Sequence, residues 1–489
     1  MKIIKISCSL VLALTLAVKG YGSDSNYQAN LDKNHDANAT PPPVQITQRL
    51  LLSGQNNNEA WDNLQAILAD GQTPDGGSIY YQSRPNNASE TSGDLLSSAK
   101  DNFAFLVNKA NQAKKDIYIQ LAISVKDNPP NSTRCPHGVQ PGECTSLEAS
   151  VAAVHDIADG KSDRLYDNLI KYINNNPKPI YLLRLDYEVS SNFFCDPNVD
   201  PKIGCEVYKR MFRHLRDLIN TGTKNSGARV YYIYHPVRGE YQILYPGNDV
   251  VDWIGLSVFE HDLCLPHFDG SAYGYNGFPA TSFVPNSTCN IGDGRFIIDG
   301  NILGAVAFAN AMNKPVIISE SAITNYVDRS QSHPHDGSSF SWQSAYRQAS
   351  RTWVNRLFSL IHYNGVVPIN CNPANPNRSP ACKSDKDNPV INLSSTIKAV
   401  VYINNDFRYG FDGSQPSSPD CKLETKTESN IPGCVPFNTG WFNDARLYND
   451  SNAYKGNSFI SLNAKAKDAF CIGLKKSKFT VTCKETYTE

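Results

Sequence analysis

The chain has 489 residues, of which 40% are hydrophobic and 19% charged. That length is enough for one large domain or for two or three average ones. The formal net charge of −1 favours neither a nucleic-acid partner nor an anionic membrane surface.

The N-terminus has the pattern of a cleavable secretory signal. Lys2 and Lys5 give a positive start, residues 6–18 form an apolar run, and Gly20 and Gly22 precede a polar stretch. The run is too short to span a bilayer, and no later segment reaches the ~20 apolar residues that a spanning helix needs. We therefore expect residues 1–22 to be a signal peptide and the protein to be secreted, to the extracellular space or the periplasm.

The cysteines agree with export. Removal of Cys8 with the signal leaves twelve of the 13 cysteines, an even number that predicts six disulfides. Spacing favours pairing between neighbours, each pair closing one surface loop, and no tight CxxC spacing indicates a metal site. The expected pairs are Cys135–Cys144, Cys195–Cys205, Cys264–Cys289, Cys371–Cys382, Cys421–Cys434 and Cys471–Cys483.

After a polar segment, 23–45, that we expect to be a disordered tether, strand and helix patterns alternate. Short apolar or alternating runs predict eight strands, and longer amphipathic runs predict helices between most of them. The expected strands are 49–53, 78–83, 116–124, 179–189, 229–235, 251–259, 315–321 and 397–404; the helices are 59–68, 95–113, 164–174, 207–220, 302–312 and 342–363.

Eight such units suit a closed (β/α)8 (TIM) barrel better than an open nucleotide-binding sheet, and no Gly-rich phosphate loop follows any strand. We expect residues 46–489 to form one barrel with long disulfide-stapled loops. A C-terminal extension that holds four cysteines is included in this range.

Two of the predicted strands end in a glutamate, Glu188 and Glu320. In the strand that ends in Glu188, alternation would place Arg184, Asp186 and Glu188 on one face. The same alternation would place Leu183, Leu185 and Tyr187 on the other face. Because the carboxyl ends of barrel strands meet at one mouth, the two glutamates are a candidate pair for hydrolysis of a glycosidic bond. Two like charges held close together also raise the pKa of one of them. The alternative is that both glutamates are structural and held in salt bridges.

Four segments resemble the retaining glycoside hydrolases of clan A, most of all family 26 and its near relatives. They are LRLDYE (183–188), YPGNDVVDWIG (245–255), KPVIISES (314–321) and YINNDF (402–407), and the resemblance extends over about 50–449. It implies that Glu188 is the acid/base at the end of strand four and that Glu320 is the nucleophile at the end of strand seven. Arg184 would then hold the charge and orientation of Glu320.

The chain also departs from the family pattern. Tyr187 stands where the mannanases have His. Phe259 stands where the relatives have either Trp or Tyr, and a Tyr there can hydrogen-bond the nucleophile, which Phe cannot. Trp441 resembles a Trp at the edge of the family's cleft and is a further candidate for sugar binding. The resemblance therefore leaves a specificity for mannan unsupported.

Three other residues have two possible roles each. His235 either binds a sugar hydroxyl or is a loop histidine before a proline. Tyr234 and Tyr402 either stack on a pyranose or belong to the barrel core.

The sequence thus predicts a secreted, monomeric glycoside hydrolase that cleaves a β-linked polysaccharide with retention, needing neither metal nor cofactor. One alternative is a catalytically inactive carbohydrate-binding protein on the same barrel. Phe259 favours this alternative, because it cannot donate a hydrogen bond to the nucleophile. Another is a disulfide-rich surface or adhesion protein, in which Glu188 and Glu320 would not face each other.

Overall fold

The computed structural model describes much of the predicted barrel. The described residues are 46–54, 58–82, 94–95, 97–124, 154–189, 205–236, 241–259, 300–322, 353–355, 357–358, 360–361, 366–368, 390–392, 396–404, 460 and 464–484. The predicted signal peptide, the tether, most of the loops and Trp441 lie outside these ranges.

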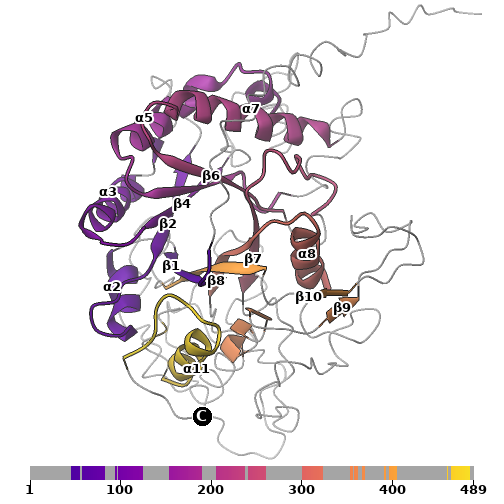
Figure 1. Cartoon of the computed structure of the whole chain (residues 1–489). Coiled ribbons are helices and arrows are strands. Elements are labelled where there is room, and N and C mark those ends of the chain that lie inside the picture. The colour runs from indigo at the N-terminus through magenta and orange to yellow at the C-terminus, as the bar shows by residue number, and fades with distance from the viewer. Residues whose placement is uncertain are drawn as a thin grey trace, which may run out of the picture. The chain divides into compact units, whose positions relative to one another are not determined.

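Eight parallel strands close into a barrel (Figure 1). In chain order they are β1 (Leu50–Gly54), β2 (Gly76–Gln82), β4 (Tyr118–Ser124), β5 (Ile180–Leu185), β6 (Arg229–Tyr234), β7 (Trp253–Phe259), β8 (Val316–Ala322) and β11 (Ile397–Ile403). Each pairs with its neighbour, and β1 pairs with both β11 and β2, so the sheet has no open edge between them. The predicted (β/α)8 fold is confirmed.

The helices occupy the expected intervals, with small shifts at their ends. They are α2 (Asn58–Ile67), α3 (Ser97–Gln112), α5 (Asp167–Asn175), α7 (Glu206–Thr223) and α8 (Gly300–Ala311). A short 3-10 turn, η1 (Asp163–Tyr166), precedes α5. The described residues of the predicted helix 342–363 are helical as well. Short pieces that the sequence did not predict are β3 (Asp94–Leu95), antiparallel to β2, and a separate antiparallel pair, β9 (Val366–Pro368) and β10 (Val390–Asn392).

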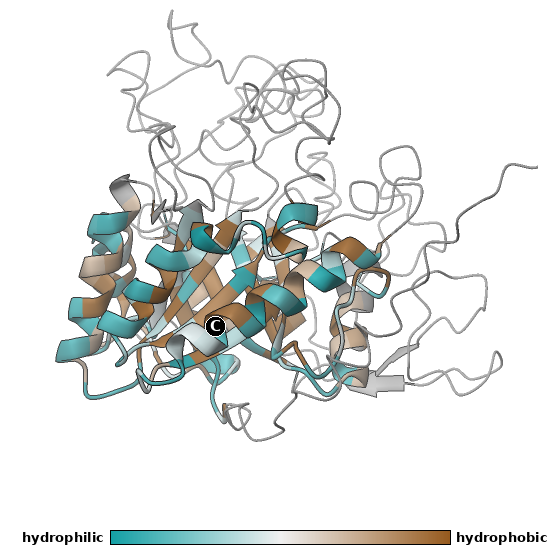
Figure 2. Cartoon of the chain, turned by 90° about the horizontal axis from the view of Figure 1, so that it is seen from above, coloured by the Kyte–Doolittle hydropathy of each residue, from teal (hydrophilic) through white to brown (hydrophobic). Residues whose placement is uncertain are grey.

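The core lies between the strands and the surrounding helices. Alternate residues of each strand, such as Leu183 and Leu185 of β5, join a buried cluster with helix residues such as Phe212 and Leu215 of α7. Figure 2 shows apolar strands at the centre and helices with hydrophilic outer faces. Among the described residues, no helix is long and apolar enough to cross a bilayer.

Barrel closure depends on a glycine at the start of β2. Gly76 pairs with Leu52 of β1 on one side and with Tyr118 of β4 on the other. A Cβ atom at position 76 would lie 1.9 Å from the carbonyl oxygen of Tyr118, so no larger residue fits without moving the backbone. The close approach of β4 therefore requires glycine here.

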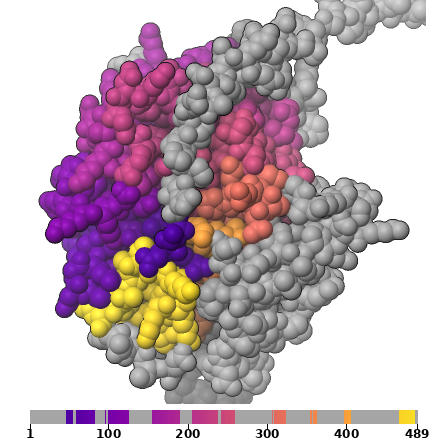
Figure 3. Space-filling model, viewed as in Figure 1, coloured from indigo at the N-terminus to yellow at the C-terminus, as the bar shows by residue number. Residues whose placement is uncertain are grey.

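The C-terminal segment packs on the first strand. Helix α11 (Ala464–Lys476), which the sequence did not predict, places Phe470 against Tyr402 of β11, with ring centroids 5.2 Å apart. Beyond it, the Thr480 amide donates to the Arg49 carbonyl at 2.9 Å, and Arg49 donates its guanidinium hydrogens to three carbonyls, including that of Ser477. Figure 3 shows this segment in contact with β1.

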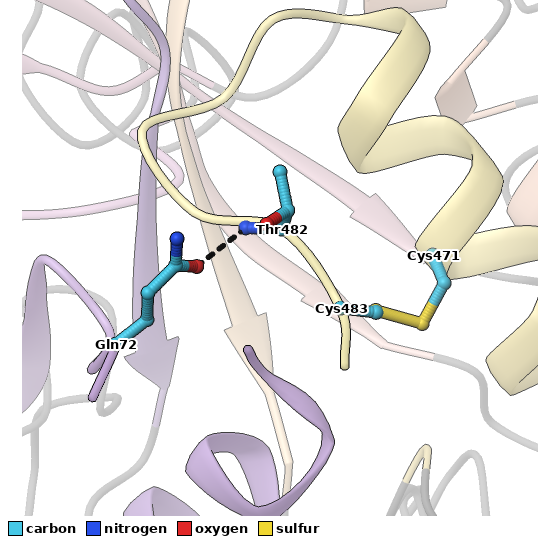
Figure 4. The surroundings of a disulfide bond; sticks show 4 residues. All are labelled: Gln72, Cys471, Thr482 and Cys483. Atoms are coloured by element: carbon cyan, nitrogen blue, oxygen red, sulfur yellow. Dashed lines mark hydrogen bonds between the residues drawn. A yellow bond between two sulfur atoms is a disulfide. The ribbon is translucent and has the colours of Figure 1, made fainter. Parts of the chain in front are cut away.

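One disulfide fastens this segment. Cys471 of α11 is bonded to Cys483, which confirms one of the six predicted pairs (Figure 4). Nearby, the Thr482 amide donates to the Gln72 side chain at 2.7 Å. Cys205 is also disulfide-bonded, but its predicted partner, Cys195, lies outside the described residues, as do the other predicted pairs.

Replacing both Cys471 and Cys483 with Ser should lower the free energy of unfolding by about 3 kcal/mol, because the crosslink restricts a loop of 12 residues in the unfolded chain. Urea unfolding measures this loss. The control is Gln72→Ala, which removes only the hydrogen bond to Thr482 and should cost about 1 kcal/mol. A double variant as stable as the wild type would contradict the expectation.

Candidate active site

A buried arginine and a strand-end glutamate form the centre of the candidate site. Arg184 of β5 is completely buried, and its Nη2 donates to Oε1 of Glu320 of β8 at 2.6 Å. Glu320 is itself only 7% exposed. Since an isolated buried charge would be strongly disfavoured, each of the two groups provides the partner that the other needs.

A bulge in β8 directs Glu320 into the barrel. Ile318 is opposite Leu256 of β7, but the next residue of β7, Ser257, is opposite Glu320. The register between β8 and β11 shifts in the same place. Ser319 is therefore an extra residue, and a bulge of this kind can change the face on which the following side chain lies. Glu320 consequently reaches Arg184 inside the barrel, whereas Ile318 belongs to the helix-side core.

The carboxyl end of β5 departs from the predicted alternation. The strand ends at Leu185, and both Asp186 and Glu188 have left-handed backbones, with φ of 60° and 50°. Such a conformation costs a non-glycine residue roughly 1–2 kcal/mol, and strain of this kind is concentrated at functional sites.

The expected arrangement of the residues after β5 is therefore wrong for Tyr187. Tyr187, expected on the opposite face, lies over Arg184, whose Cζ is 4.9 Å from the ring centroid. Asp186 is buried, and burial together with the charge of Asp186 raises the pKa of Tyr208 on α7. Period-two alternation no longer holds once the backbone leaves the strand conformation.

His235 lies beneath the site and is fully buried. Its Nδ1 is 3.0 Å from Nη1 of Arg184, and its Nε2 is 3.2 Å from the hydroxyl of Ser257. A guanidinium can only donate, so Nδ1 must accept and the ring is neutral, with its proton on Nε2. His235 directly follows β6 and precedes Pro236, as the loop alternative expected, but it is buried and orients Arg184. Its contact with a sugar hydroxyl stays a prediction.

Tyr80 of β2 also belongs to the site, although the sequence did not indicate it. Its hydroxyl donates to Oε1 of Glu320 at 3.0 Å. Its ring packs edge-on against Tyr187, with centroids 5.8 Å apart. A single tyrosine within an alternating strand has no distinctive sequence signal, so only the barrel register could have revealed it.

The site's electrostatics depend on opposing effects. Burial raises the pKa of Glu320, and the nearby charge of Glu188 raises it as well. The charge of Arg184 and the hydrogen bonds from Arg184 and Tyr80 act in the opposite direction. The charge of Glu188 therefore acts on Glu320, as a pair of catalytic carboxylates requires.

The remaining predicted site residues have different positions. Tyr234 and Tyr402 are fully buried on the helix side, where Tyr234 packs on Tyr208 and Tyr402 packs on Phe470, so the core alternative holds for both. The backbone of Phe259 pairs with Ala322 at the end of β7. Neither the side chain of Phe259 nor Trp441 is among the described parts of the chain.

Substitution of Arg184 by Met should lower the free energy of unfolding at pH 7 by about 3–5 kcal/mol, because it leaves the Glu320 carboxylate buried without its counter-charge. Loss of Arg184 raises the pKa of Glu320 further. As the pH falls through that pKa, the carboxyl is protonated and the cost disappears. The deficit relative to the wild type should therefore shrink between pH 7 and pH 5 in chemical denaturation.

Arg213→Met is the matched control, since its ion pair with Asp249 is exposed and worth at most about 1 kcal/mol. Adding Glu320→Gln to the Arg184 variant should restore part of the lost stability. An Arg184 deficit that is the same at both pH values would show that Glu320 is not responsible for it.

Comparison with curated proteins identifies two relatives with short matches. The chain is 30% identical over 114 residues to the β-1,3-xylanase TXYA of a Vibrio species, and 28% identical over 114 residues to a β-1,3-xylanase of an Alcaligenes species. Each match covers 23% of this chain and 23% of the relative, so it spans less than a quarter of either relative's length. No protein-family model matches the chain.

Similar solved structures include several mannanases. Bacillus subtilis mannanase man26 has a TM-score of 0.36 and 13% identity, over 74% of this chain and 81% of that one. A double mutant of Cellulomonas fimi endo-β-1,4-mannanase has a TM-score of 0.38 and 12% identity, over 86% and 71%. The chain's own strand order, rather than these likenesses, establishes the barrel.

Proposed function

We propose that this protein is a retaining glycoside hydrolase that cleaves a β-linked polysaccharide, with Glu320 as nucleophile and Glu188 as acid/base. The observation that carries the proposal is the Glu320 carboxylate, held by Arg184 and Tyr80 at the carboxyl end of β8 and influenced by the charge of Glu188 beyond the end of β5. This end of a barrel is where catalytic groups gather.

The proposed reaction has two steps. The ionised Glu320 attacks the anomeric carbon while Glu188 protonates the departing glycosidic oxygen, which gives a covalent glycosyl-enzyme. Glu188, now ionised, then removes a proton from water, and that water breaks the ester bond and regenerates Glu320. Retention requires the two carboxyl groups to be ~5 to 5.5 Å apart. No cofactor takes part in either step.

The strand-end motifs at 183–188 and 314–321 support the choice of a clan A reaction, and the curated relatives suggest the substrate class. Because both are β-1,3-xylanases, β-1,3-xylan is our first candidate. We also propose that the protein works outside the cytoplasm, since a disulfide such as Cys471–Cys483 persists in oxidising compartments.

The purified, oxidised protein should release reducing ends from at least one of β-1,3-xylan, β-1,4-xylan, mannan, mixed-linkage glucan and bacterial cell-wall glycan. Glu320→Ala should reduce this activity to background, and Glu188→Ala should reduce it by about 10²- to 10⁴-fold. With azide added, Glu188→Ala should yield a β-glycosyl azide through two inversions, and Glu320→Ala an α-glycosyl azide through one.

Glu206→Ala is the control, because Glu206 is an exposed glutamate on α7 that forms an ion pair with Lys209. It should leave hydrolysis unchanged. Hydrolysis that survives Glu320→Ala would refute the assignment. Binding without hydrolysis by the wild type would instead favour the inactive carbohydrate-binding alternative.

A further inference from the structure

We propose that Tyr80 is a positioning residue that, together with Arg184, occupies Oε1 of Glu320 and thereby makes Oε2 the attacking oxygen. The inference rests on the proposed role of Glu320 and adds to it both a residue and the identity of the reacting atom. It assigns Tyr80 no direct part in bond breaking.

The two hydrogen bonds converge on one atom. Oε1 accepts from Nη2 of Arg184 at 2.6 Å and from the hydroxyl of Tyr80 at 3.0 Å. Oε2 accepts no hydrogen bond within the described part of the chain. A carboxylate oxygen that accepts two hydrogen bonds, one of them from a charged donor, is a weaker nucleophile than the other oxygen of the same carboxylate, which accepts none. The arrangement therefore distinguishes two oxygens that are chemically equivalent in free glutamate.

Neighbouring residues fix the direction from which Tyr80 approaches. In the barrel register Tyr80 of β2 is opposite Ala122 of β4, and Ala122 is opposite Arg184 of β5. Because the side chain of Ala122 is small, Tyr80 and Arg184 can approach each other across it. The Arg184 Cζ lies 5.8 Å from the centroid of the Tyr80 ring. Edge-on contact with Tyr187 supports the ring from another side.

The charges around Glu320 indicate what the hydroxyl does. Among the described residues, Arg184 is the positive group and Glu188 the negative group that act on Glu320. His235 and Tyr187 contact Arg184. Burial raises the pKa of Glu320, and the hydrogen bond from Tyr80 lowers it. Because a hydrogen bond donated to the ionised form stabilises that form, Tyr80 keeps Glu320 charged at a lower pH than burial alone would allow.

Tyr80→Phe tests the proposal, since it removes only the hydroxyl. The acid limb of the pH profile of kcat/KM should move to higher pH by about one unit, because a hydrogen bond to a charged group is worth roughly that much. We expect kcat to fall about tenfold and KM to stay within about twofold. The matched control is Tyr81→Phe, whose hydroxyl donates to the carbonyl of Leu165 at 2.7 Å and should not shift the profile.

A second readout does not depend on catalysis. Selective ¹³C labelling of glutamate carboxyls, with Glu320→Gln to assign the resonance, gives the pKa of Glu320 directly, and it should rise in Tyr80→Phe but not in Tyr81→Phe. An unchanged Glu320 titration would overturn the proposal. A raised KM with unchanged kcat would also overturn it and make Tyr80 a substrate contact. If Glu320→Ala retains activity, the proposed function fails, whatever the titration shows.

Discussion

A completely buried guanidinium needs partners for its charge, and that requirement organises the interior of this barrel. Of the Arg184 guanidinium nitrogens, only Nε is left without a hydrogen-bond acceptor among the described residues. Arg184 is held by an ion pair from β8, a neutral imidazole from the end of β6 and the faces of two tyrosines. The positive charge of Arg184 in turn determines how each partner is oriented and protonated. His235, for example, has only one tautomer that accepts from Arg184 and can still donate to Ser257.

Irregular backbone at two strand ends makes this arrangement possible. The bulge at Ser319 places Glu320 on the inner face, and the left-handed residues after β5 bring Tyr187 back over Arg184. A regular strand would have directed each side chain to the other face. The barrel tolerates this backbone strain because each strand is held by pairing with a strand on both sides. The close approach of β2 and β4 at Gly76 is part of that pairing.

The eight strands could be predicted from sequence because each is a short apolar run with a helix or loop after it. Glu188 and Glu320 could be identified because each follows an apolar run near the carboxyl end of a strand, where the catalytic groups of a barrel gather. The sequence did not reveal Tyr80, since its partner is 240 residues away and only the register joins them. Tyr234 and Tyr402 could not be assigned because strand alternation defines two faces without saying which faces the helices.

The central claim is that Glu320 is the nucleophile, and covalent trapping tests it most directly. The protein would be incubated with a 2-deoxy-2-fluoro glycosyl fluoride of the sugar released in the substrate panel, then digested and analysed by mass spectrometry. The account predicts one added glycosyl group, on the peptide that contains Glu320, and none in Glu320→Gln. A label on another carboxylate, with Glu320 unmodified, would contradict it.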